Sequence, residues 1–493
     1  MKSQTKIRWL LFIFVWLAIA VYTHPGTFYP ALLTTALVEE HTFQIDRYAN
    51  LSQDQSYVNG HYYWGGHPGV PLLGVPAGFA ASLLLDHVAP EALKSKLDQH
   101  LSAHYSESDN KRLQAASTRL SLLKPLVVSL VMSVTVGAMG GALVAAVMYD
   151  FLGSLGLRET ERILLSLLTV MGTLVCVYAP AHGGQVPSAL FGFSAFYLLY
   201  QGKQQPLRTR SVLVAGAVLG LSLMMRYQGV ILVFIVGLYG LSVLKPRQWL
   251  IFAAGALITV TPLLIYHHVN FGSPFKVAQQ FPSFADRWGM HGAHNKGFLG
   301  MGTPDPVAML QLLVSPKYGY FFFMPITVVG LGYAVVSAFR PQLRREAMVA
   351  LGIFVAFWVG ASTADIRFAG TVFGPRYLVE TIPFVMLFTA LAWRDGRIPQ
   401  PVICVLGGVS LILCYIGLQY PMPMHELEFS RNPLFDVYWP MIREHILYSA
   451  ILDHLSHLLH LTKPMTIFLN AVVAAALAVF AWFIYRLGQK ASP

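Results

Sequence analysis

Residues 402–418 read VICVLGGVSLILCYIGL, a stretch without a single charged side chain. A helix that crosses a lipid bilayer needs roughly 20 mostly apolar residues, within a range of about 17–25. Similar runs recur along the chain, and each predicts a membrane-spanning helix. The twelve runs begin near Trp9, Leu126, Ile163, Leu190, Ser211, Val230, Leu250, Tyr320, Val349, Leu378, Val402 and Ile467. We therefore predict an all-α integral membrane protein with about twelve transmembrane helices.

The composition of the whole chain supports the same class. Of 493 residues, 55% are hydrophobic and 12% are charged, whereas soluble domains carry about 25% charged residues. The net charge of +11 does not indicate nucleic-acid binding, because the Lys and Arg residues lie in short loops and form no continuous basic face. Each of the three cysteines lies in an apolar run, so no disulfide framework is predicted.

The positions of the basic residues predict which way the helices face. Half of the 34 Lys and Arg residues lie near the termini or in the short loops that follow the even-numbered helices, and such segments are cytoplasmic by the positive-inside rule. One polytopic domain, 1–493, then exposes three large loops, 24–125, 267–319 and 419–464. We expect cytoplasmic termini, periplasmic loops and a bacterial inner-membrane location. A cleaved signal peptide is the alternative for the first run and leaves the next loop on the exported side.

A thirteenth apolar run, 70–85, is ambiguous. It contains Pro71, Pro76 and two glycines, which interrupt a helical pattern. Counting it as a span would turn the loop 340–345, with its three arginines, to the exported side, against the positive-inside rule. We therefore predict that 70–85 is one of several juxtamembrane helices in the first loop, lying in or dipping into the outer interface.

The first large loop holds most of the residues that could carry chemistry. A site that handles sugars needs a carboxylate to take a proton from a hydroxyl, and flat rings to stack on a pyranose. The candidate bases are Glu39, Glu40, Asp46 and Asp54, and the candidate substrate-binding residues are His61, Tyr62, Tyr63, Trp64 and, later in the chain, Tyr377. The alternative interpretation is an ordinary interfacial loop with a Tyr/Trp belt.

Cations at the ends of spans are candidates for binding a phosphate. Arg376 stands where the chain begins the tenth span, Arg226 lies in a very short outward turn, and His67 follows the tyrosine-rich stretch. A guanidinium fork suits phosphate oxygens at the depth of lipid headgroups. The alternative is a snorkelling arginine that anchors a helix end.

Motifs for other chemistries are missing from the sequence. It contains no Walker motif and no dinucleotide fingerprint, so ATP hydrolysis and nicotinamide chemistry are unsupported. Histidines are frequent, yet no pair has a metal-ligand spacing with a third ligand nearby. We predict no metal ligands and no certain cofactor, and leave a divalent cation open.

The order of these segments resembles the C-type membrane glycosyltransferases (GT-C), which use polyprenyl-phosphate sugars. The similarity runs as an ordered series over most of residues 7–400. The stretches that carry it are 37–48, 60–69, 270–274, 315–320 and Phe373-Gly374-Pro375-Arg376-Tyr377.

The resemblance implies an inverting sugar transfer, in which a loop carboxylate acts as base and cations hold the departing lipid phosphate. The chain departs from the family where an acid often follows the first span, because it reads Gly26-Thr27 there. Gln185 likewise stands where a second acid is often seen. Asp46 and Asp54 then rank first as the base.

Three functions stay open on the sequence. The leading hypothesis is a glycosyltransferase of the cell envelope that moves a hexose or pentose from a polyprenyl-phosphate donor to a lipid, glycan or protein, among membrane lipids. The second is a multi-helix transporter or lipid-linked-sugar flippase. The third is a glycan polymerase or ligase with a similar outward loop. The sequence does not name the sugar or the acceptor.

Overall fold

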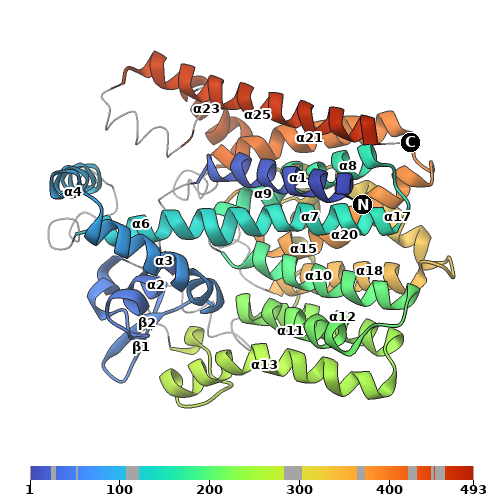
Figure 1. Cartoon of the computed structure of the whole chain (residues 1–493), viewed down its shortest axis with the longest axis horizontal. Coiled ribbons are helices and arrows are strands. Elements are labelled where there is room, and N and C mark those ends of the chain that lie inside the picture. Colours follow the sequence, from blue (N-terminus) through green and yellow to red (C-terminus); the bar gives the residue numbers. More distant parts are fainter. Residues whose placement is uncertain are drawn as a thin grey trace.

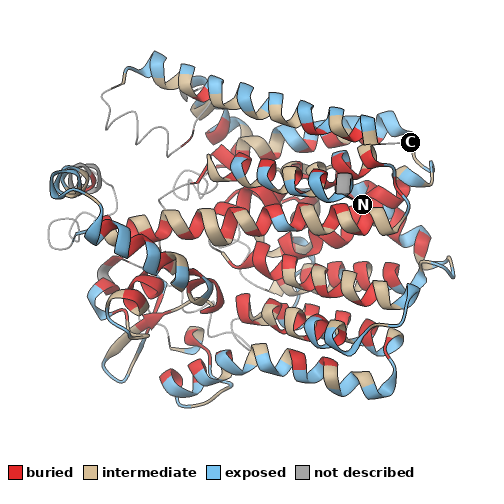
Figure 2. Ribbon diagram, viewed as in Figure 1, coloured by how far each residue is buried: buried red, intermediate tan, exposed pale blue. Residues whose placement is uncertain are grey.

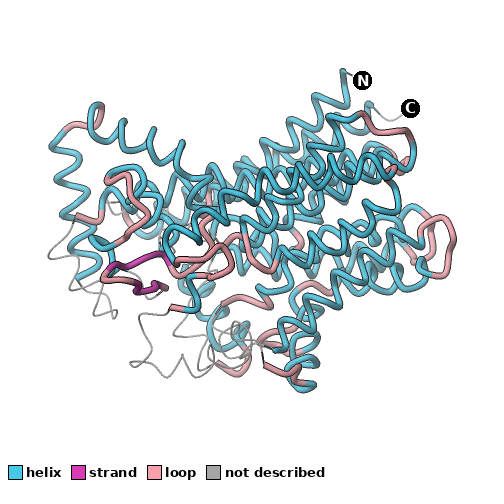
Figure 3. The backbone as a smooth tube through the Cα atoms, turned by 90° about the horizontal axis from the view of Figure 1, so that it is seen from below, coloured by secondary structure: helices cyan, strands magenta, loops and turns pink. Residues whose placement is uncertain are grey.

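The computed structural model describes residues 2–23, 29–51, 54–106, 121–181, 183–281, 302–363, 372–419, 430–445, 449 and 461–491. Long helices run side by side through most of the molecule, and a smaller lobe of shorter helices and one hairpin lies at one end (Figure 1). The turned view shows the same separation, with the strands at the end opposite the two termini (Figure 3).

All twelve predicted apolar runs begin in helical segments. The long helices are α1 (Lys2–Ala20), α6 (Leu123–Met132), α7 (Met139–Ser154), α8 (Glu159–Met171), α10 (Gln185–Gln204), α11 (Thr209–Met225), α12 (Gly229–Val243), α13 (Pro246–Phe271), α17 (Ile326–Ala338), α18 (Arg344–Thr363), α20 (Ile382–Arg394), α21 (Gln400–Gln419) and α25 (Lys463–Ala491). A π-helical turn, Ser133–Ala138, joins α6 to α7. Shorter pieces are α9 (Leu174–Tyr178), α15 (Pro306–Val314), α16 (Tyr320–Phe323), α23 (Trp439–His445) and the turns η2 (Asp46–Leu51), η4 (Ala179–Ala181), η5 (Ala278–Gln280), η6 (Arg376–Thr381) and η7 (Leu434–Tyr438).

Several of these helices are long and apolar enough to cross a membrane. In the described ranges, seven helical segments are long and apolar enough to cross a bilayer, or eight if α8 and α9, bent by 52°, count as one. Three further apolar helices, α11, α12 and α17, are shorter. A multi-pass membrane protein is therefore supported, while the number of twelve spans stays a prediction.

Burial follows the position of each helix in the bundle. In the most apolar stretch of the span that contains η6 and α20, 89% of the residues are buried. The corresponding share is 11% in α25 and 22% in α13. Figure 2 shows the buried centre and the exposed outer helices. Apolar side chains such as Leu250 and Phe468 point outward from these outer helices, as expected where lipid replaces water as the solvent.

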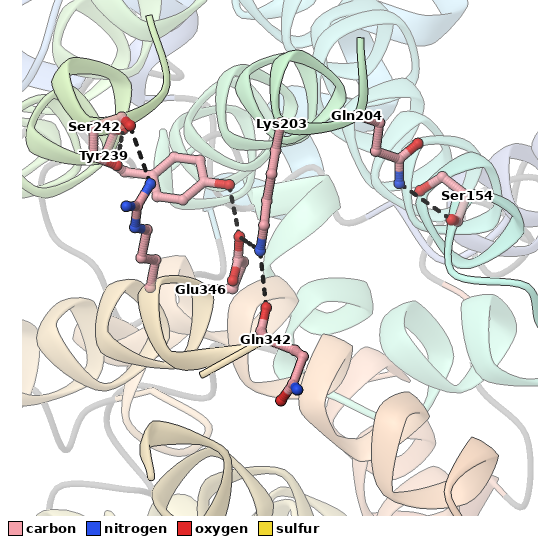
Figure 4. A network of polar contacts seen from close by, with 8 residues as sticks. Ser154, Lys203, Gln204, Tyr239, Ser242, Gln342 and Glu346 are labelled. Atoms are coloured by element: carbon pink, nitrogen blue, oxygen red, sulfur yellow. Dashed lines mark hydrogen bonds and ion pairs between the residues drawn. The ribbon is translucent and has the colours of Figure 1, made fainter. Parts of the chain in front are cut away.

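Both termini lie at the end of the bundle that carries the short basic loops (Figure 1). Lys203 in the last turn of α10 donates to Glu346 at the start of α18 over 2.9 Å, and the Tyr239 hydroxyl of α12 donates to the same oxygen over 2.9 Å (Figure 4). Arg8 pairs with Asp150 over 2.9 Å. The predicted cationic segments thus gather at one end, opposite the lobe.

The lobe at the other end is built from the first predicted loop. It contains α2 (Tyr29–Glu39), β1 (Gln55–Val58), β2 (His61–Trp64), α3 (Gly69–His87) and α4 (Glu91–Ser106). The antiparallel strands pair Gln55 with Trp64 and Val58 with His61. Their turn is Asn59-Gly60, both at positive φ, which is the pair that a two-residue hairpin turn favours. The all-α prediction missed this hairpin.

The ambiguous run 70–85 forms one unbroken helix, α3. Pro71 lies in its first turn, where a missing N–H is tolerated, and Pro76 lies inside the helix without ending it. Helix α3 packs against α6 through contacts of Gly74 with Met132 and Gly78 with Val128. The segment Leu123–Ser154 has 32 residues, about 48 Å of helix against a hydrocarbon core of about 30 Å. Helix α3 lies beside α6, but with 19 residues it is also one of the seven segments long and apolar enough to cross a bilayer, so its interfacial position stays a prediction.

Candidate active site

A buried ion pair links two segments that are distant in the sequence. Arg226 lies in the turn between α11 and α12, and Glu380 lies in η6. Arg226 Nη1 donates to Glu380 Oε1 over 2.5 Å, and the two side chains are 3% and 0% exposed. Buried charges persist only when they are paired, so this contact fixes the turn against the start of the tenth predicted span. Sequence reasoning missed Glu380.

Tyr377 lies next to two guanidinium groups. Arg226 Cζ lies 5.3 Å from the centre of its ring, and Arg376 Cζ lies 5.0 Å from the same centre. Arg376 Nη2 also donates to the Tyr377 hydroxyl over 3.1 Å. An aromatic face attracts cations at such distances, so the ring holds both arginines in one place. This arrangement offers positive charge to an anionic ligand.

Asp54 is the predicted base that the structure brings to these arginines. Its carboxylate interacts electrostatically with Arg376 and with Tyr377. Asp54 is itself exposed, and its carbonyl accepts a hydrogen bond from the Gly65 N–H over 3.1 Å at the base of the hairpin. The hairpin thus places an acid of the first loop within electrostatic range of a cation in η6.

His67 lies against the turn that carries Arg226. Its ring meets the Tyr227 ring edge-on, with centres 4.3 Å apart, and its Nδ1 accepts the Tyr227 N–H over 3.5 Å. Burial, with smaller contributions from the charges of Arg226 and His267, lowers the pKa of His67 to about 3. His67 is therefore neutral near pH 7 and can offer a phosphate a hydrogen bond but no charge.

Close backbone contact explains the glycine after His67-Pro68. A Cβ on Gly69 would lie 2.2 Å from the carbonyl oxygen of Met224, which is far inside van der Waals contact. Gly184, at φ +73°, approaches the Met225 carbonyl in the same way, with a 2.5 Å separation for an added Cβ. Only glycine permits these approaches, so the stretch that ends in Gly69 is held against the end of α11.

The second predicted loop reaches the same region through His267, near the end of α13. Its Nε2 lies 2.9 Å from the Tyr227 hydroxyl, and its Nδ1 lies 3.2 Å from the Pro274 carbonyl. A carbonyl only accepts, so Nδ1 carries the proton and Nε2 accepts from Tyr227. Ser56 of β1 adds a hydrogen bond to the Ala278 carbonyl over 2.6 Å. The first and second loops therefore form one unit.

The other three predicted bases make contacts within the lobe. Asp46 accepts hydrogen bonds from the Tyr62 N–H over 2.6 Å and from His61 Nδ1 over 2.8 Å. Glu39 and Asp86 share Lys124, at 2.5 and 2.8 Å. Glu40 lies 3.7 Å from Arg47. These contacts brace the hairpin and join α2 and α3 to α6.

The predicted substrate-binding residues of the first loop lie in two different environments. Tyr63 and Trp64 are buried; Tyr63 packs edge-on against Phe271 with ring centres 5.7 Å apart, and Trp64 Nε1 donates to the His67 carbonyl over 3.3 Å. Tyr62 and His61 are half-buried on the hairpin. The first two therefore contribute packing, whereas Tyr62 packs on Tyr57 with ring centres 4.8 Å apart and His61 contacts Asp46.

Some predicted features lie outside the described residues. They include Gly26-Thr27, residues 282–301 of the second predicted loop, and residues 420–429, 446–448 and 450–460 of the third. Across the described ranges, no three His, Cys, Asp or Glu side chains are placed to hold a metal ion. Gln185, described and buried, has an amide oxygen without a hydrogen-bond partner there.

Two solved structures are similar to this chain. One is ArnT from Cupriavidus metallidurans bound to undecaprenyl phosphate, with 13% identity, a TM-score of 0.48, and coverage of 98% of this chain and 75% of that one. The other is the oligosaccharyltransferase AglB from Archaeoglobus fulgidus in complex with an inhibitory peptide and a dolichol-phosphate. It shows 12% identity, a TM-score of 0.42, and coverage of 85% and 56%.

No protein-family model matches the chain, and no curated protein matches it. Because both TM-scores lie below 0.5, no residue role is carried over from either structure, and the function proposed next rests on the site itself.

Proposed function

We propose that this protein is a membrane glycosyltransferase that moves a sugar from a polyprenyl-phosphate donor to a lipid, glycan or protein acceptor. Asp54 acts as the base, and Arg376 binds the donor phosphate with Arg226 behind it. The feature that supports the proposal is that the charge of Asp54 in the first loop acts through space on Arg376 of η6, in the cluster where Arg376 Nη2 donates to the Tyr377 hydroxyl. A carboxylate beside a guanidinium combines the two groups that an acceptor hydroxyl and a leaving phosphate require.

The proposed step keeps the total charge of the site constant. Asp54 takes the proton of the acceptor hydroxyl, the acceptor oxygen bonds to the anomeric carbon, and the bond from that carbon to the phosphate oxygen breaks. The phosphate gains one negative charge while Asp54 loses one. Neutralising Asp54 removes its attraction for Arg376, so the guanidinium interacts more strongly with the leaving phosphate.

We place this site on the exported face of a bacterial inner membrane. The basic loops and both termini gather at the opposite end (Figure 1), and such loops are cytoplasmic by the positive-inside rule. The polyprenyl chain then lies against apolar helix surfaces. The choice between hexose and pentose, and any need for a divalent ion, follow from activity measurements.

A transfer assay tests the proposal directly. Purified protein in nanodiscs receives a radiolabelled polyprenyl-phosphate sugar together with a crude lipid or glycan extract, and the label in the product is counted. We expect transfer by the wild type, loss of at least 100-fold in Asp54→Asn and Arg376→Ala, as order-of-magnitude estimates for a lost base and a lost charge stabiliser, and a much smaller loss in Asp46→Asn.

Two outcomes contradict the proposal. Equal losses in Asp46→Asn and Asp54→Asn would remove the distinction between the two acids. Intact donor with every extract, together with movement of the lipid-linked sugar across proteoliposomes, would replace transfer by a flippase or transporter function.

A further inference from the structure

We propose that Glu380 sets how many negative charges the donor site accepts, so that the site takes a lipid joined to its sugar by one phosphate and disfavours a diphosphate. This inference rests on the proposed function and adds a specificity-determining residue to it. The Glu380 side chain is 0% exposed and paired with Arg226, so it acts through Arg226.

The charges around Tyr377 carry this inference. Two cations, Arg226 and Arg376, lie next to the ring. Glu380 offsets the first of them at 2.5 Å, inside the protein where no solvent screens the pair. His67 adds no charge because burial lowers its pKa to about 3. Among the described residues, the charge that a ligand phosphate meets is therefore mainly that of Arg376, moderated by the exposed Asp54.

A second observation shows that Glu380 is not optimised for stability alone. Its other carboxylate oxygen, Oε2, is buried and has no hydrogen-bond partner among the described residues. An unpaired buried oxygen on a charged group is costly, and an apolar pair in place of a buried ion pair is often as stable. The retained charge is better explained by its electrostatic effect on the site.

The two donor classes differ by one charge. A lipid phosphate sugar carries one negative charge, and a lipid diphosphate sugar carries two. With Glu380 present, the second charge meets a site in which one of two cations is already neutralised. One unit charge several ångströms from the ligand, at an effective dielectric of about 20, has an interaction energy that partial screening reduces further. The resulting change in ligand affinity is about tenfold.

The test compares two probes, a polyprenyl monophosphate and a polyprenyl diphosphate of the same chain length, by their inhibition of transfer and by binding to protein in nanodiscs. We expect the wild type to bind the monophosphate more tightly. Glu380→Gln should shift the ratio of the two affinities toward the diphosphate by about tenfold, because the positive charge of Arg226 is then no longer offset by a carboxylate. The matched control is Arg226→Met with Glu380→Met, which removes both charges and should keep the wild-type ratio.

The possible results separate this inference from the proposed function. An unchanged ratio in Glu380→Gln overturns the role of Glu380 while wild-type transfer leaves the function intact. If Glu380→Gln does not fold, the wild type decides, since equal or tighter binding of the diphosphate overturns the inference. Wild-type protein that neither binds these lipids nor transfers sugar refutes the proposed function itself.

Discussion

Removing Arg226 alone is expected to destabilise the protein far more than removing Arg226 and Glu380 together. The pair is 3% and 0% exposed and separated by 2.5 Å. Breaking a buried pair by deleting one partner costs about 3–5 kcal/mol, because a charge stays behind without compensation. Replacing both partners by apolar side chains of similar size is often close to neutral.

The structure allows an estimate for each variant. Arg226→Met loses the ion pair and the contact of the guanidinium with Tyr377 at 5.3 Å, so we expect a loss of about 4 kcal/mol in the free energy of unfolding. Arg226→Met with Glu380→Met loses only the ring contact and small packing differences, about 1 kcal/mol. In the Glu380→Met background, adding Arg226→Met should therefore stabilise the protein.

Thermal unfolding of the purified variants in one detergent, followed by tryptophan fluorescence at a fixed heating rate, ranks their stabilities. Unfolding of large membrane proteins is often irreversible, so midpoints are compared at the same heating rate rather than converted to equilibrium values. We expect the single variant to unfold several degrees below the double variant. Equal losses from Arg226→Met in the wild-type and Glu380→Met backgrounds would refute the pairing argument, because uncoupled residues give additive effects.

Three further predictions concern single residues near the site. Asp54→Asn should abolish transfer yet bind polyprenyl phosphate about fivefold more tightly in a binding assay, since one exposed repelling charge is lost; weaker binding would contradict the proposed charge balance. His67 has a folded pKa of about 3 against 6.5 for an unperturbed histidine, so the unfolded state binds more protons between these values, and stability falls as the pH drops from 6.5 toward 3. The thermal midpoint of His67→Gln should fall less over this range, and parallel curves would refute the assignment. Gly69→Ala places a Cβ 2.2 Å from the Met224 carbonyl and should lower stability and transfer, whereas Gly237→Ala, with no atom within 4 Å of its Cβ, should not; equal midpoints would refute the close contact.

The helical part of the fold could be predicted from the sequence because each apolar run carries its own signal. A stretch such as 402–418 becomes a helix in a membrane whatever surrounds it, since its backbone groups must be satisfied within the segment. The hairpin 55–64 was missed, although its alternating residues and the Asn59-Gly60 turn are a local hairpin signal. That signal was overlooked rather than absent.

The site was harder to predict because its members meet only through packing. Nothing local distinguishes Asp46 from Asp54; both are acids shortly before the tyrosine-rich stretch. The difference arises where the hairpin folds back: Asp46 then accepts hydrogen bonds from His61 and the Tyr62 N–H, whereas the charge of Asp54 acts on Arg376. Glu380 did carry a signal, because a lone acid inside an apolar run demands a partner, but the sequence does not say that the partner is Arg226.

In our proposal the acids of the first loop have two roles. Some of them hold the hairpin in place, and Asp54 acts as the base. Glu39 and Asp86 hold Lys124, which fixes α2 and α3 to the projecting part of α6. Asp46 ties η2 to β2. Asp54 sits at the base of the strand that these contacts hold, and an exposed carboxylate can serve as a base only if its position is fixed by others. The same contacts therefore explain why three carboxylates are engaged within the lobe and why Asp54 is the one presented to the arginines.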